Sequence, residues 1–158
     1  MFKFRKNIIF SIYRYGHWVF YIKNPIIRFI FNIPYKFLFF TVSKMLFNAE
    51  IYPKAKIGKN LQLPHHGNGV IIDDATIGDN VIIRPQVIIG KTFKGGSKCA
   101  TIGNNVDIGV GAKILGNISI GDNVKIGALA VVIKDVPSNV TVVGIPAEIV
   151  SRSKSSAV

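Results

Sequence analysis

Two adjacent histidines, His65 and His66, are the residues of this sequence best suited to acid–base chemistry. An imidazole titrates near neutral pH, so it can accept a proton from an alcohol. A histidine base also needs a carboxylate that holds one tautomer, and Glu50, fifteen residues before His65, is the candidate. These residues could instead have structural roles. The histidines would then form hydrogen bonds to backbone groups at a corner, and Glu50 would be a solvated carboxylate.

A polar, basic and glycine-rich stretch from Lys91 to Thr101 holds the other reactive side chains. Cys99 is a candidate nucleophile, but packing as a small buried residue is favoured because no histidine lies near it in sequence. Lys98 suits a phosphorylated ligand or a solvated loop equally well. One cysteine and three histidines do not provide a multi-cysteine or three-histidine site, so we expect no metal.

A six-residue repeat must position these side chains. Aliphatic residues recur at this step in three blocks, namely Ile51, Ile57 and Leu63, then Ile71, Ile77, Ile83 and Ile89, then Ile102, Ile108, Ile114, Ile120, Ile126 and Val132. This period is the hexapeptide signature of a parallel β-helix. Each unit forms one face of a triangular coil, with its aliphatic residue pointing inward. Four asparagines should turn the corners at positive φ, namely Asn60, Asn80, Asn105 and Asn123.

The repeat is interrupted twice. The step from Leu63 to Ile71 is eight residues, and both histidines fall inside it. The step from Ile89 to Ile102 is thirteen residues, which predicts one loop extruded from the coil. Loops on a rigid scaffold commonly carry function, so these interruptions predict the location of the site.

The first 47 residues differ in composition from the rest. They hold eight Lys and Arg, no acidic residue and fifteen of the seventeen aromatics in a chain of net charge +12. An apolar stripe (Ile8, Ile12, Tyr15, Val19, Ile22) predicts helix, continued by Leu38, Val42 and Met45, and Pro25 and Pro34 should divide it into three pieces. Such a segment suits an anionic membrane surface, or packing on the protein itself or a neighbouring subunit. No nucleic-acid motif accompanies the charge, so we expect no nucleic-acid partner.

The predicted organisation is therefore a helical segment at 1–47, a coiled domain at 48–150 and a tail at 151–158. No uncharged run approaches the ~18–20 residues of a spanning helix. With no apparent export signal and no disulfide framework, we expect a cytoplasmic protein, peripheral to the inner face of a bacterial membrane through residues 1–47.

Residues 48–150 resemble serine acetyltransferase-like hexapeptide acyltransferases. The resemblance is carried by "IYPKAKIGKNLQLPHHGNGVIID", "ATIGDNVIIRPQVIIGK", "IGNNVDIGVGAKILGNISIGDNVKIGALAVVIKDVP" and "VVGIPAEIV". Within this group, "HHG", an arginine in the next repeat (Arg84) and a cysteine before the late "IGN" look closest to colanic-acid or capsule O-acetyltransferases.

The resemblance implies a mainly β protein: a left-handed parallel β-helix, assembled as a homotrimer with active sites between subunits and acetyl-CoA as donor. By position, His65 matches the catalytic histidine and Glu50 its acidic partner, whereas His66 has no matching role. The resemblance also implies which positions bind coenzyme A. Four small residues match positions beside the pantetheine, namely Gly109, Gly111, Ala112 and Ala128, and two basic residues match the region of the phosphates, namely Lys134 and Arg152.

The acceptor is the point at which this sequence departs from the family. Classical serine acetyltransferases place an Arg-His pair where this chain has Lys98 and Cys99, and they carry a longer helical domain. These differences predict a sugar hydroxyl in exopolysaccharide or capsule synthesis as acceptor, with His66, Arg84, Lys98 and Cys99 on the acceptor side. The alternatives are a serine O-acetyltransferase of cysteine synthesis and a non-catalytic scaffold at the membrane.

Overall fold

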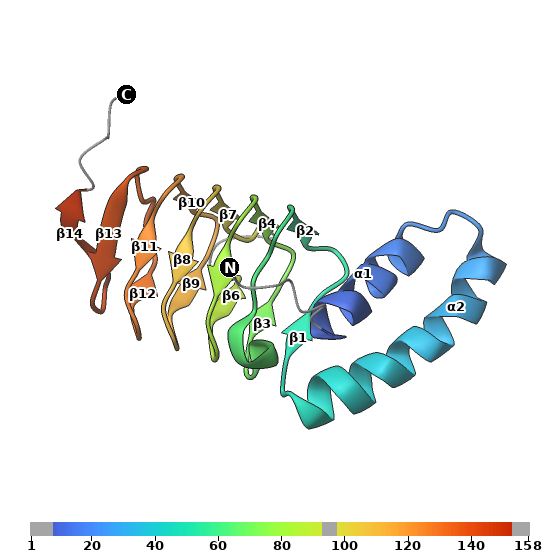
Figure 1. The fold of residues 1–158 in the computed structure, drawn as a ribbon. Coiled ribbons are helices and arrows are strands. Elements are labelled where there is room, and N and C mark those ends of the chain that lie inside the picture. Colours follow the sequence, from blue (N-terminus) through green and yellow to red (C-terminus); the bar gives the residue numbers. More distant parts are fainter. Residues whose placement is uncertain (1–7, 93–97, 153–158) are drawn as a thin grey trace.

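The computed structural model describes residues 8–92 and 98–152. Its helical part comprises α1 (Ile8–Phe20), α2 (Pro25–Leu38), the π-helical η1 (Phe39–Leu46) and the 3-10 turn η2 (Pro64–Gly67). The strands are β1 (Glu50–Ile51), β2 (Lys56–Ile57), β3 (Ile71–Ile72), β4 (Thr76–Ile77), β5 (Ile82–Ile83), β6 (Ile88–Gly90), β7 (Thr101–Ile102), β8 (Asp107–Ile108), β9 (Lys113–Leu115), β10 (Ser119–Ile120), β11 (Lys125–Ile126), β12 (Val131–Val132), β13 (Val140–Val143) and β14 (Glu148–Arg152). Figure 1 shows the helices at one end of the stacked strands and β14 at the other.

The strands form three sheets that the chain visits in turn. Sheet A has the order β1-β3-β6-β9-β12, sheet B the order β10-β7-β4-β2, and sheet C the order β14-β13-β11-β8-β5. Neighbours pair in parallel, except that β13 and β14 are antiparallel. Each round through A, B and C is one coil, so the predicted parallel β-helix is confirmed.

The repeat positions fill the interior of the coil. Among them Ile83, Ile89, Ile108 and Ile114 are fully buried. One assignment was wrong: Ile72 is buried, whereas Ile71 lies beside Glu50 with its side chain half-buried on the outer face. A second inward set, two positions before the aliphatic one, was missed because its members are small or varied, namely Ala49, Ala55, Leu61, Val70, Ala75, Val81, Val87, Ala100, Val106, Ala112, Ile118, Val124 and Ala130.

Asparagines form a ladder along the edge between sheets B and C. The four predicted corner asparagines and a fifth, Asn139, have φ between 55° and 63°. Each side-chain amide donates to the next one along the edge, at 2.9–3.2 Å. The left-handed backbone and the amide bonds together explain why asparagine recurs at this corner.

Helix α1 closes the open end of the coil. Ile9 and Tyr13 belong to the same buried cluster as the first coil, and the Tyr13 hydroxyl donates to the Ala55 carbonyl at 2.8 Å. Burial raises the pKa of Tyr13 to about 12. The predicted stripe was partly wrong, because Ile8 is 46% exposed and the buried face also includes Gly16.

Helix α2 begins as predicted but does not stop where expected. The Asn24 side chain accepts from the amides of Ile26 and Ile27, and Pro25 occupies the first turn, where its missing N–H costs nothing. Pro34 lies inside α2 without ending it, so three helical pieces were one too many. Of the described helices, the continuous 22-residue stretch Pro25–Leu46 contains an 18-residue window of mean hydropathy 1.3, so it is long and apolar enough to cross a membrane by length and composition. The charged residues Arg28, Lys36 and Lys44 interrupt this stretch, so it was not expected from the sequence.

Candidate active site

The predicted histidine and several predicted coenzyme A positions lie along one edge of the prism. This histidine edge, between sheets C and A, is turned in successive coils by residues 63–70, 84–87, 109–112 and 127–130. Its turns are stacked by backbone hydrogen bonds, from the amides of Gln86, Gly111 and Leu129 to the carbonyls of Asn68, Pro85 and Val110, at 2.8–3.0 Å. The coil therefore places His65 in line with Gly109, Gly111 and Ala128.

Both histidines have left-handed backbones and exposed side chains. Their φ values are 53° for His65 and 60° for His66, inside the turn η2. The His66 ring packs against Phe47, with 5.4 Å between ring centroids. No hydrogen bond to the His65 imidazole is present among the described residues, so this ring is available to a ligand at the edge.

Glu50 does not contact His65. One carboxylate oxygen pairs with the Lys44 ammonium at 3.0 Å, and the other accepts from the Tyr52 hydroxyl at 3.3 Å. Burial and the adjacent Glu50 carboxylate raise the pKa of Tyr52. The pairing of Glu50 with Ile71 across β1 and β3 places Glu50 at the start of β1, next to the histidine edge, and its two carboxylate oxygens keep further acceptor sites beside the bonds to Lys44 and Tyr52. Nothing in the sequence marks Lys44 as its partner.

The small residues of the histidine edge are explained by coil packing. A Cβ on Gly109 would lie 2.5 Å from the amide nitrogen of Ala128 in the next coil, and Gly111 has φ +70°. Ala112 is 0% exposed, so its side chain faces the core, and its predicted place beside the coenzyme would involve its backbone alone. Only Ala128 of this set presents an exposed side chain.

The predicted phosphate contacts are not on this edge. Lys134 is exposed and follows β12, at the edge between sheets A and B. The backbone of Arg152 pairs with Val140 at the end of β14, and the placement of its side chain lies outside what the structure describes. Within one chain, sheet A separates Lys134 from the turn that carries Gly109 and Gly111.

The edge between sheets A and B, here the loop edge, carries the second interruption. Lys91 pairs with Asp74 at 2.9 Å and with Asp73 at 3.8 Å, and the bond to Asp74 raises the pKa of Lys91. Cys99 is 7% exposed and belongs to the core, and burial raises the pKa of its thiol. It therefore packs in the core, as the sequence favoured. Lys98 is exposed, while residues 93–97 of the predicted loop lie outside the described residues.

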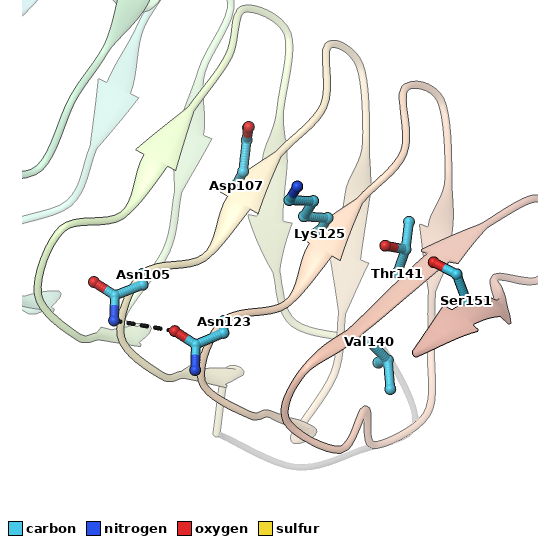
Figure 2. Close-up of a pocket in the computed structure, with 7 residues that line it drawn as sticks. All are labelled: Asn105, Asp107, Asn123, Lys125, Val140, Thr141 and Ser151. Carbon is cyan, nitrogen blue, oxygen red and sulfur yellow. Dashed lines mark hydrogen bonds between the residues drawn. The ribbon is translucent and has the colours of Figure 1, made fainter. Parts of the chain in front are cut away.

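Arg84 forms an ion pair on the surface of sheet C. Its guanidinium donates to both carboxylate oxygens of Asp107, at 3.1 and 2.8 Å, and this pair raises the pKa of Arg84. A hollow of about 470 Å³ lies on the same face (Figure 2) and is lined by Asn105, Asp107, Asn123, Lys125, Val140, Thr141 and Ser151. Among the side chains that the structure describes, no predicted site residue lines it. Figure 2 shows side chains from consecutive strands along an open face.

No protein-family model matches the chain, but individual proteins do. The chain is 41% identical over 143 residues to a serine acetyltransferase of Synechococcus elongatus, covering 89% of this chain and 55% of that protein. It is 51% identical over 113 residues to one of Staphylococcus aureus, covering 70% and 53%. The structure matches a serine acetyltransferase from Brucella abortus, in complex with coenzyme A, with TM-score 0.77 and 34% identity over 92% of this chain and 55% of that one.

These comparisons overturn the predicted acceptor. The similar proteins are serine acetyltransferases, so the sugar acceptor and the closeness to polysaccharide O-acetyltransferases, inferred from Lys98 and Cys99, were wrong. The burial of Cys99 shows why that argument failed, since a core residue reports on packing and not on the acceptor. The chain spans about half the length of the curated relatives it matches. By sequence and by its left-handed parallel β-helix, the coiled domain is similar to serine acetyltransferases.

Proposed function

We propose that this chain transfers an acetyl group from acetyl-CoA to the hydroxyl of L-serine. The observation that carries the proposal is the match at 51% identity over 70% of the chain. Any continuous 70% of the chain includes its centre, and with it both interruptions of the repeat. The similarity therefore extends to the segments that would form the site and is not confined to the regular coils.

In the proposed reaction, His65 removes the proton from the serine hydroxyl as the oxygen attacks the thioester carbonyl. A new C–O ester bond forms, the C–S bond breaks, and coenzyme A leaves as the thiol, which takes up the proton from His65. The coenzyme would lie along the histidine edge, whose turns carry Gly109, Gly111 and the exposed Ala128. Glu50 would orient His65 by accepting a hydrogen bond from the imidazole on a free lone pair of its carboxylate.

We further propose a homotrimer with shared sites. In one chain, sheet A separates the histidine edge from the loop edge that carries Lys98 and Lys134. A site that uses both edges is completed most simply when the loop edge of one subunit meets the histidine edge of its neighbour. The mass of the purified protein in solution tests this assembly directly.

The activity is tested by measuring thiol release from acetyl-CoA with L-serine, with a sugar panel in parallel. His65→Asn and His66→Asn form a matched pair, because both positions are exposed and asparagine tolerates the positive φ. We expect His65→Asn to lower kcat by about 10²–10⁴, the usual contribution of general acid–base catalysis. We expect His66→Asn to stay within about threefold of the parent, since no chemical step uses it.

Two results would contradict the proposal. Equal losses in the two variants would indicate that the turn η2 matters only for folding, which circular dichroism and the oligomeric mass would reveal. No thiol release above background with L-serine, from protein that is folded and binds coenzyme A, would reject serine as acceptor.

A further inference from the structure

Helix α2 presents an unbroken apolar stripe to solvent. Six residues at helical spacing form this stripe, and each is 57–70% exposed, namely Ile26, Phe29, Ile30, Ile33, Phe37 and Phe40. Large apolar side chains in such number on one face are unusual on a monomeric surface and mark an interaction site. Only 11% of the candidate membrane window in Pro25–Leu46 is buried in the protein.

The opposite face of α2 is fixed on the protein. Tyr35 is buried, and its ring lies so close to Gly16 of α1 that a Cβ at Gly16 would collide with it. Burial raises the pKa of Tyr35 to about 12. Figure 1 shows α2 running outside α1 before the chain enters β1. The stripe therefore faces away from the rest of the protein. The contact between Tyr35 and Gly16 keeps α2 from rotating to bury it.

The charge around the stripe has a single sign. Residues 1–47 contain no Asp or Glu. The basic side chains of Arg14, Lys23, Arg28 and Lys36 are exposed on α1, α2 and the turn between them. A second copy of this surface would bring like charges together, whereas anionic lipid headgroups would neutralise them. We propose that α2 lies in the surface of an anionic lipid bilayer, with the stripe immersed at the boundary between headgroups and acyl chains.

The connections of α2 favour lying in the surface over spanning. At its end, the chain enters β1 within the folded coil. Before its start, α1 is held to the coil through His17, whose Nδ1 lies 2.8 Å from the Pro53 carbonyl. The four residues 21–24 reach at most about 14 Å, and the hydrocarbon of a bilayer is about 30 Å thick. Both ends of α2 thus stay on one side of the membrane.

Exposed aromatics extend the same surface onto α1. Trp18 and Tyr21 are 52% and 54% exposed, and the Trp18 ring packs edge-to-face on Phe31 of α2 at 5.2 Å. Tryptophan and tyrosine prefer the headgroup region. Trp18 is the single tryptophan of the chain, so its fluorescence reports on this surface alone.

The test is co-sedimentation of the full chain with vesicles of phosphatidylcholine, with and without phosphatidylglycerol. Deleting residues 1–47 is unsuitable, because it removes the core contacts of Ile9 and Tyr13. The variant Phe29→Glu/Phe37→Glu places two charges on the stripe. The matched control Ile149→Glu/Val150→Glu places the same charges on exposed positions of β14, far from the helices.

We expect the parent and the β14 control to bind anionic vesicles, with release by salt and a blue shift of Trp18 emission. The stripe variant should bind at least about tenfold more weakly, since two immersed phenyl rings are replaced by charges. Equal binding of the parent and the stripe variant would overturn the proposal. A second result would also overturn it: the parent does not bind vesicles, and the mass in solution is lower for the stripe variant than for the parent. That result would assign the stripe to contact with a second copy of the chain. Vesicle binding does not depend on acetyl transfer, so the two proposals fail separately.

Discussion

The proposed chemistry pairs Glu50 with His65, whereas the structure pairs Glu50 with other residues. The Glu50 carboxylate is held by Lys44 and Tyr52, while the His65 ring has no partner among the described side chains. Glu50 therefore has two alternative roles. It positions His65 during the reaction, or it holds η1 against the first coil. The two roles predict different effects of substitutions at Lys44.

We expect Glu50→Gln to lower kcat about 10- to 100-fold with little change in the KM for acetyl-CoA, because a neutral amide holds the imidazole less well. Glu50→Asp should recover most of the loss. Lys44→Met should change kcat less than about threefold, since it frees the carboxylate. Steady-state kinetics on the three variants decide the matter: a loss in Lys44→Met as large as in Glu50→Gln would show that the ion pair matters for structure alone.

The asparagine ladder is the element that makes the corners of the coil regular. Asn80 sits inside it, donating to Asn105 at 3.1 Å and accepting from Asn60 at 3.0 Å, with φ 56°. Asn80→Ala loses both bonds and strains the left-handed backbone, which we expect to cost about 2 kcal/mol of unfolding free energy. Asn80→Gly loses the bonds without the strain and should cost about 1 kcal/mol.

Urea unfolding of these two variants measures both values. A smaller loss for Asn80→Ala than for Asn80→Gly would contradict the argument from backbone conformation. Equal stability of both variants and the parent would mean that exposed amide bonds add nothing to the corner.

The coil could be predicted from the sequence because each of its positions repeats a local rule. Residues such as Ile108 and Asn105 recur in step, and the structure places them inward and at the corner. The helices obey no such period, so Pro34 was wrongly expected to end one. The turn at Leu129, with φ 60°, also had no sequence signal, since a leucine rarely adopts that backbone.

The position of His65 could also be predicted, because it follows from an interruption of the same repeat. The interruption placed His65 on an edge, and stacking of the coils then aligned it with Gly111 and Ala128. The partner of Glu50 was not predictable, because Lys44 comes from η1 and its approach depends on how the helices dock. Which side chains face outward from α2 likewise follows from docking on α1.

The molecule as a whole depends on α1 to close its core. Ile9 is 1% exposed within the buried cluster, whereas its neighbour Ile8 is 46% exposed. We expect Ile9→Ala to lower the unfolding free energy by about 2–4 kcal/mol through the lost contacts and the cavity. Ile8→Ala, the matched control, should stay within about 0.5 kcal/mol of the parent. Thermal or urea unfolding of the pair is the measurement, and equal effects would mean that α1 does not seal the coil.

The antiparallel pairing of β14 on β13 gives this architecture a finite length. A stack of interchangeable parallel coils is a template for its own polymerisation, because each free end offers the next chain a complete row of strand edges. Here α1 packs at one end, and at the other end β14 reverses the edge of sheet C, so that this edge does not offer the parallel register that another coil would copy. The same two features that complete the fold therefore work against end-to-end growth into a fibre.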